Sequence, residues 1–421
     1  MCVMSNGESV QEASAGIPVK AAYMTLFLIV AAHAVNHAYV ALMPILYPVI
    51  MSNLNFNYTQ LGLLLGITRV FGQGLQWLAG YMGRFFKRKT LVGFGAIFQG
   101  VFLGLSGTSA NFFQLTSWQS LNSLSGSPQH PNGNSLILES VGKQARGRAL
   151  AINYAGGNVG TVLVPLVGAG LLGYLGWRST IAAFGLLGIV VGLMILFLVR
   201  EERPSADAGA GKKERPHFGK ETLEVLKKRN MVLILLAQAS AAGGRGLGIL
   251  ITFVPLYISQ QLKMSVMSTG MLYTIMMIGS VVGPMLAGVV SDKVSQRKLV
   301  LVTTYLLSTI TTVFMVHLGH YTWLLPIVLF LMGCFVYSES PLLQSLTADS
   351  TEGMSKDMVF GVYFTIGFGS GAIWAAAIGY LVHRFGFVTA FYVMAASYLV
   401  GAFWVALLKL KKRSPILQAA R

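Results

Sequence analysis

The chain has 421 residues, of which 54% are hydrophobic and only 11% are charged. A soluble domain of ordinary composition carries about 25% charged residues, so this composition excludes a soluble protein and indicates an integral membrane protein. The formal net charge of +17 would suit a nucleic-acid-binding protein. Such a protein gathers its basic residues on one surface among aromatic side chains. Once the basic residues next to apolar spans are set aside, this sequence has no basic cluster of that kind left.

The apolar residues fall into twelve successive spans, each long enough to cross about 30 Å of hydrocarbon. We draw these spans at residues 21–50, 58–82, 90–109, 111–138, 149–172, 179–199, 231–259, 267–290, 299–317, 321–347, 358–382 and 388–408. They predict an all-α integral membrane fold of twelve transmembrane helices, with both termini on one side. Only Arg178, Lys263 and Arg384 lie in odd-numbered connections, so the positive-inside rule places both termini in the cytoplasm of a multi-pass protein of the cell membrane.

The longest hydrophilic stretch, residues 200–230, divides the spans into two groups of six. Its early part is typical of a flexible linker, and Lys220–Lys228 is typical of an amphipathic helix lying on anionic lipid. We predict a cytoplasmic tail at 1–20, a six-helix bundle at 21–199, a cytoplasmic linker at 200–230, a second six-helix bundle at 231–408 and a cytoplasmic tail at 409–421. The first twenty residues lack the pattern of a cleaved signal peptide, and we expect none.

The first span carries His33, Asn36 and His37 on nearly one helix face, because residues three and four apart are neighbours on a helix. Ionisable groups in hydrocarbon usually face a bundle interior or an aqueous path, which predicts that all three line one cavity. Neutral histidines bonded to neighbouring helices are the plain alternative. A zinc site is another, since two histidines four apart can share a metal, but no acidic or Cys third ligand accompanies them and we expect no metal.

Two arginines lie inside spans: Arg69, with Gln73 four residues later, and Arg245, which stands among four glycines. An arginine at the centre of a membrane helix costs about 2.5 to 3.5 kcal/mol on the insertion scale, so each needs a compensating group. An interhelical ion pair is the plain interpretation, but Glu339 is the single acidic residue in the middle of a span. The surplus of cations favours an anionic ligand, because Arg binds planar carboxylate or phosphonate groups through two hydrogen bonds.

A His-Pro pair at His130 in the fourth span and a Glu-Ser-Pro run at Glu339 in the tenth occupy corresponding positions of the two halves. Proline frees a helix carbonyl, and matched broken segments indicate a central transport site, although proline kinks also occur in membrane helices that bind nothing. Tyr154 and Asn158 lie in the glycine-rich fifth span. The glycines predict close helix packing, and the two polar side chains are candidates for substrate contact or for packing.

Two short connections share a Gly followed by basic residues: Gly288–Lys298, which also contains an Asp, and Gly80–Lys89, which does not. The pattern resembles the loop signature of the major facilitator superfamily, whose members are transporters built from two homologous halves. The resemblance implies that the Gly lets two helices approach closely and that acidic and basic residues form a gate on the cytoplasmic side. The candidate gating residues are Arg84, Arg88, Glu139, Arg148, Gly288, Asp292, Lys293, Arg297, Lys298 and Asp349.

Within that superfamily the chain resembles the fosmidomycin-resistance branch of drug exporters. The resemblance rests on His33 and Asn36, the His-Pro pair at His130, the stretch Gly147–Pro165, and Arg245 followed by Thr252–Pro255. The branch tends to carry an Asp where this chain has His37 and a Glu where it has Asn132, and both changes remove negative charge from the cavity. The Arg of the second span and the Gly-Gly-Asn-x-Gly of the fifth are also similar to nitrate porters, but the eighth span lacks the second Arg that those porters use.

We therefore predict a secondary active transporter that moves a small organic anion by rocking of the two halves, coupled to protons. The predicted substrate-binding residues are His33, Asn36, His37, Arg69, Gln73, His130, Tyr154, Asn158, Arg245 and Glu339, and the predicted proton carriers are His33, His37, His130 and Glu339. An exporter of drug-like or amphiphilic compounds and an inorganic anion porter are the alternatives. A membrane sensor or enzyme lacks support, since neither an HExxH motif nor a nucleophile elbow is present. We expect no cofactor, and the resemblance implies a monomer.

Overall fold

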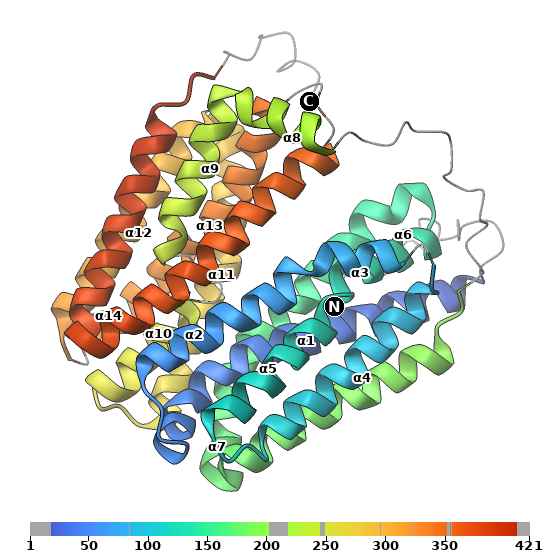
Figure 1. Cartoon of the computed structure of the whole chain (residues 1–421), viewed down its shortest axis with the longest axis horizontal. Coiled ribbons are helices and arrows are strands. Elements are labelled where there is room, and N and C mark those ends of the chain that lie inside the picture. Colours follow the sequence, from blue (N-terminus) through green and yellow to red (C-terminus); the bar gives the residue numbers. More distant parts are fainter. Residues whose placement is uncertain are drawn as a thin grey trace.

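The computed structural model describes residues 18–83, 85–201, 218–244, 249–294, 296–320, 322–351, 354 and 356–410. Its helices form two groups, α1 to α7 and α8 to α14, which lie side by side as two bundles of six membrane crossings each (Figure 1). The crossings expected from the apolar spans are therefore present. The two bundles touch at one end and diverge toward the other, near α3, α6 and α8 (Figure 1).

The first bundle contains six crossings, some of them interrupted. Its elements are α1 (Val19–Asn53), α2 (Tyr58–Arg69), η1 (Val70–Gly74), α3 (Gln76–Met82), α4 (Arg88–Ser106), α5 (Phe112–Gly126), η2 (Gln129–Gly133), α6 (Asn134–Ser140), the short turn η3 (Lys143–Ala145) and α7 (Arg146–Leu198). The π-helices η1 and η2 break the second and fourth crossings. Such breaks recur at functional sites, because the widened turn releases backbone groups and re-aims side chains.

The second bundle follows the same order. Its elements are α8 (Phe218–Lys227), α9 (Arg229–Ala241), η4 (Ala242–Gly244), α10 (Ile251–Leu256), η6 (Tyr257–Gln261), α11 (Val266–Val294), α12 (Arg297–Leu318), α13 (Leu324–Ser350) and α14 (Lys356–Ala406). Helix α8 lies beside α9 at the end where the bundles diverge (Figure 1). The seventh crossing is assembled from α9, η4, α10 and η6, so it is interrupted as the second and fourth are.

Two long helices each make two crossings by folding back at a glycine. Among the described residues, seven helices are long and apolar enough to span a membrane, and α7 and α14 are each about twice the length of one crossing. Helix α7 turns at Gly176, with φ 71°, and α14 turns at Gly386, with φ 82°. Only glycine adopts such angles without strain, so these residues set the reversals between the fifth and sixth and between the eleventh and twelfth crossings.

The bundles meet at the end opposite to the described chain termini. Helix α2 packs on α14 through Gly62 and Gly379, where a Cβ on Gly379 would lie 2.8 Å from the Gly62 Cα. Tyr58 contacts Phe387 at this junction, with ring centroids 5.2 Å apart. Helix α7 meets α11 in the same region, where Gly270 packs on the backbone of α7. In the part of the chain that the structure describes, these close backbone contacts between the bundles lie at this end, where small residues let the helices approach.

Candidate functional site

Three histidines gather inside the first bundle. His33 and His37 come from neighbouring turns of α1, and His130 comes from η2. The ring centroid of His33 lies 4.6 Å from that of His37 and 5.0 Å from that of His130. One nitrogen from each ring lies within 4.8 Å of the other two. The break at η2 therefore turns the His130 side chain toward the stripe on α1, and the three rings form one cluster.

Hydrogen bonds to α7 hold two of these rings. The Nδ1 atom of His33 lies 2.8 Å from the carbonyl oxygen of Asn153, and the Nδ1 atom of His37 lies 3.0 Å from the hydroxyl of Thr161. The Nε2 atoms of the two histidines are 3.1 Å apart. A Cβ on Gly157 would come within 2.9 Å of the His33 ring, so the glycine at this position lets α7 approach the cluster.

The remaining polar residues of α1 and α7 lie around the cluster. The Tyr154 ring is 6.1 Å from that of His33, while 55% of this residue is exposed. Asn36 points to the other side and donates to the Gln99 side chain and the Gly126 carbonyl, both at 3.4 Å. Asn158 is half-buried on α7. The structure thus joins three of the predicted residues closely, sets Tyr154 at their edge and turns Asn36 toward α4 and α5.

Several polar residues around the histidine cluster were not predicted as site residues from the sequence. Gln99, Asn122, Asn153 and Thr161 are all at most 7% exposed, and Asn122 donates to the Gln99 carbonyl at 2.7 Å. Asn153 also donates to the Asn134 side chain at 2.9 Å. Each is an amide or hydroxyl inside an apolar span, which is the signal that would have marked them, because buried polar groups require partners.

Arg69 lies where the two bundles meet. It ends α2 at the start of η1 and is only 9% exposed. A Cβ on Gly371 of α14 would overlap its guanidinium, so the arginine side chain reaches across to the second bundle at a position that only glycine leaves open. Gln73 follows within η1 and is half-buried. The charge of Arg69 is therefore placed at the junction between the two bundles.

Glu339 lies in the middle of α13 of the second bundle and is 2% exposed. Pro341 follows it within the same continuous helix, so the fourth and tenth crossings differ: η2 interrupts the fourth, and α13 runs unbroken through the tenth. The other predicted charge of this half, Arg245, falls outside the described residues.

Five of the candidate gating residues form ion pairs inside single bundles. Arg88 at the start of α4 pairs with Glu139 of α6. Arg297 stands at the start of α12. Its guanidinium nitrogens lie 2.5 Å from a carboxylate oxygen of Asp349 in α13 and 3.5 Å from a carboxylate oxygen of Asp292 in α11. Corresponding lysines follow: Lys89 donates to the Val199 carbonyl at 3.0 Å and Lys298 to the Leu408 carbonyl at 2.9 Å. Of the remaining candidate gating residues, Lys293 and Arg148 are exposed and Gly288 is half-buried. Arg84 is outside the described residues.

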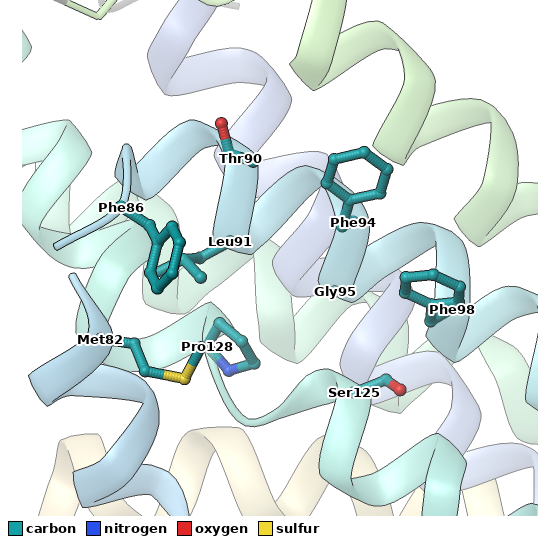
Figure 2. A pocket seen from close by; sticks show the side chains of 9 residues that line it. All are labelled: Met82, Phe86, Thr90, Leu91, Phe94, Gly95, Phe98, Ser125 and Pro128. Atoms are coloured by element: carbon teal, nitrogen blue, oxygen red, sulfur yellow. The ribbon is translucent and has the colours of Figure 1, made fainter.

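An apolar pocket of about 240 Å³ lies apart from the histidine cluster, between α3, α4 and the connection from α5 to η2. Figure 2 shows its lining, which consists of Met82, Phe86, Thr90, Leu91, Phe94, Gly95, Phe98, Ser125 and Pro128. Phenylalanine rings line one side of it and Met82 and Pro128 the other, so the pocket suits an apolar ligand and offers no charge to an anion (Figure 2).

Comparison with known proteins adds the family. The chain is 23% identical over 317 residues to a probable hexose phosphate transport protein of Chlamydia pneumoniae, covering 69% of this chain and 70% of that protein. It is 24% identical over 260 residues to a probable L-galactonate transporter of Escherichia coli (strain K12), covering 58% and 55%.

Two solved structures share the fold. A bacterial homologue of the human lysosomal transporter Spinster, inward-facing and unoccupied, superposes with a TM-score of 0.71 at 17% identity, covering 92% of this chain and 96% of that one. The nucleoside transporter NupG gives a TM-score of 0.72 at 13% identity, covering 93% and 100%. The model of the Major Facilitator Superfamily matches residues 26–257 and 234–420. The chain therefore belongs to the Major Facilitator Superfamily and is a membrane transporter rather than an enzyme.

Proposed function

We propose that this transporter moves a small organic anion across the cell membrane by alternating access, driven by protons. The observation that carries the proposal is the position of Arg69, a charged side chain buried at the junction of the two bundles. A guanidinium binds a carboxylate or phosphate through two parallel hydrogen bonds, which gives both affinity and orientation. An anion held by Arg69 touches the surface that opens and closes.

The charge inventory of the spans supports an anionic substrate. Arg69 and Arg245 lie within spans, against the single mid-span acid Glu339. The names of two relatives agree with a negatively charged substrate, since a hexose phosphate and L-galactonate are both organic anions. A carboxylated or phosphorylated compound of about sugar size is therefore the substrate class that we favour.

The packing of the bundles supports alternating access. Glycines join α2 to α14 and α7 to α11 at one end, whereas the ion pairs of Arg88 and Arg297 lie within single bundles at the other end. The distribution of basic residues supports a cytoplasmic location for that other end. We therefore assign the state described here to a transporter open toward the cytoplasm, and rocking about the Arg69 junction would expose the site to the opposite side.

Glu339 is the proton carrier that we favour. It is a carboxyl group buried in α13, and ionisable groups inside membrane bundles commonly belong to ion or proton pathways. Replacing it by Gln keeps the size and removes the titration. Substrate exchange at equal concentrations should persist in Glu339→Gln, while accumulation driven by a pH gradient should be lost. Loss of both activities would contradict a coupling role.

Transport into proteoliposomes tests the anion site. Wild-type protein should take up members of a panel of sugar acids and sugar phosphates, and Arg69→Ala should reduce uptake at least tenfold, because the buried bidentate contact is lost. Arg69→Lys keeps the charge without the planar fork and should recover only part of it. Arg384→Ala, which alters an exposed arginine, is the matched control. Equal anion uptake by Arg69→Ala and wild type would refute the site.

Export of drug-like or amphiphilic compounds, as in the fosmidomycin-resistance branch, is the second candidate. The apolar pocket beside Phe94 and Phe98 favours it, because aromatic and Met side chains bind such molecules (Figure 2). Uptake of hydrophobic cations but of no anion by the same proteoliposomes, with Phe94→Ala reducing it, would support this function instead.

A further inference from the structure

A hydrogen bond to a backbone carbonyl fixes where the proton of His33 lies in the histidine cluster. The Nδ1 atom of His33 is 2.8 Å from the Asn153 carbonyl oxygen, which can only accept, so Nδ1 carries the hydrogen. The Nε2 atom of the neutral ring then presents a lone pair. His33 is 1% exposed, so this lone pair is aimed into the bundle and away from bulk solvent.

His37 offers the same arrangement in one of its two neutral tautomers. Its Nδ1 atom is 3.0 Å from the Thr161 hydroxyl, and that hydroxyl donates its own hydrogen to the Gly157 carbonyl at 3.2 Å. In the tautomer of His37 that donates from Nδ1 to this hydroxyl, the Nε2 atom of His37 presents a lone pair. The two Nε2 atoms face each other at 3.1 Å. In the metal-free protein a proton on one of these Nε2 atoms can form a hydrogen bond to the other, and a bound cation would take the place of that proton.

His130 supplies a third nitrogen. In a tetrahedral site with Zn–N bonds of about 2.0 to 2.1 Å, the ligand nitrogens lie roughly 3.4 Å apart. The His33 and His37 nitrogens are already close to that spacing, and the three ligand atoms of the cluster lie within 4.8 Å of one another. His130 stands on the π-helix η2, and closing the cluster around one ion requires its nitrogen to move toward the other two.

We propose that His33, His37 and His130 form a binding site for a divalent d-block cation such as Zn²⁺, Co²⁺ or Ni²⁺. Three imidazoles without a carboxylate suit these ions, whereas Mg²⁺ and Ca²⁺ select oxygen ligands. The bonds from the Nδ1 atoms to Asn153 and Thr161 are of the kind that orient histidine ligands in metal sites. We predicted no metal from the sequence because no acidic residue or Cys accompanies His33 and His37 as a third ligand. In the folded chain, His130 takes that place.

A metal-binding assay tests this site directly. The full chain, purified through a tag without histidines and treated with a chelator, is incubated with Co²⁺ or Zn²⁺, desalted and analysed for bound metal. We expect about one metal per chain, a ligand-field absorption spectrum of Co²⁺ typical of tetrahedral nitrogen coordination, and no comparable retention of Mg²⁺. Retention of Co²⁺ no greater than that of Mg²⁺ would overturn the proposal.

Variants separate the cluster from other histidines. His37→Gln and His130→Gln should each weaken Co²⁺ binding at least tenfold, and Thr161→Val, which removes only the orienting hydroxyl, should weaken it about 10- to 100-fold. His383→Gln, at an exposed position, is the control and should bind as wild type does. If the cluster variants retain wild-type binding while folding normally by thermal melt, the metal lies elsewhere and the proposal fails.

A second readout does not depend on variants that fold poorly. Wild-type protein should melt at a higher temperature in Zn²⁺ than in Mg²⁺, because a ligand that binds only the folded state stabilises it. The absence of a shift in Zn²⁺ would contradict the site. The metal site is independent of the proposed anion function: metal binding is measured without substrate, and its failure leaves the role of Arg69 untouched.

Discussion

Replacing Gly379 by Ala inserts a methyl group between the two helices that join the bundles. The added Cβ would lie 2.8 Å from the Cα of Gly62 and closer still to the Tyr58 carbonyl oxygen, so α14 has to move away from α2. Overpacking of this kind costs about 1 to 3 kcal/mol. The cost falls on the state in which the helices touch, and it corresponds to a shift of roughly 5- to 150-fold toward the state in which this end is open.

Distances between spin labels measure that shift. Tyr174 in the first bundle is 90% exposed and Trp323 in the second is 73% exposed, and both lie at the end where the bundles meet. Labels on cysteines at these positions, in a background with Cys2→Ser and Cys334→Ala, should give a larger long-distance population in Gly379→Ala than in the parent. Gly369→Ala, on the same helix with open space around it, is the control. An unchanged distance distribution in Gly379→Ala would refute the assignment of this contact as the closed end.

Three further substitutions follow from local geometry. Gly176→Ala forces a positive φ on a residue with a Cβ and should destabilise the detergent-solubilised protein by about 1 kcal/mol, seen as a lower melting temperature than that of Gly173→Ala. Asn57→Ala removes the capping box at the start of α2 and should cost about 1 kcal/mol, which Asn57→Ser should largely restore. Arg297→Ala breaks two partly exposed ion pairs and should cost at most about 1 kcal/mol, with an effect that shrinks at high salt. A larger loss for Arg297→Ala than for Gly176→Ala would contradict this ranking.

The fold was predictable because long apolar stretches in the sequence mark the segments that cross the membrane. A continuous stretch of some twenty apolar residues forms a helix in a bilayer, since a helix satisfies its backbone hydrogen bonds within that one segment. The expected spans 149–172 and 179–199 match the two halves of α7, and Gly176 stands in the connection between them. The breaks at η1 and η6 were not foreseen, because they widen a helix by one residue without changing its apolar character.

The candidate site was predictable only in part. The spacing of His33 and His37 placed both on one face of α1, because helical periodicity is local. The pairing of His130 with Glu339 as matched positions did not reveal that His130 joins the α1 histidines, since that contact depends on how η2 rotates the side chain. The position of Arg69 against Gly371 likewise depends on how two bundles pack, which no pattern within the second span records.

The central claim is that Arg69 binds an anion, and thermal stability measured against a panel of ligands tests it most directly. Purified wild-type protein should be stabilised by sugar acids or sugar phosphates, by about 2.7 kcal/mol at a concentration about one hundred times the dissociation constant. The same compounds should leave Arg69→Ala unchanged, while Arg384→Ala should respond as wild type does. Stabilisation of wild type by cationic or neutral drugs alone, or equal stabilisation of Arg69→Ala by anions, would contradict the account.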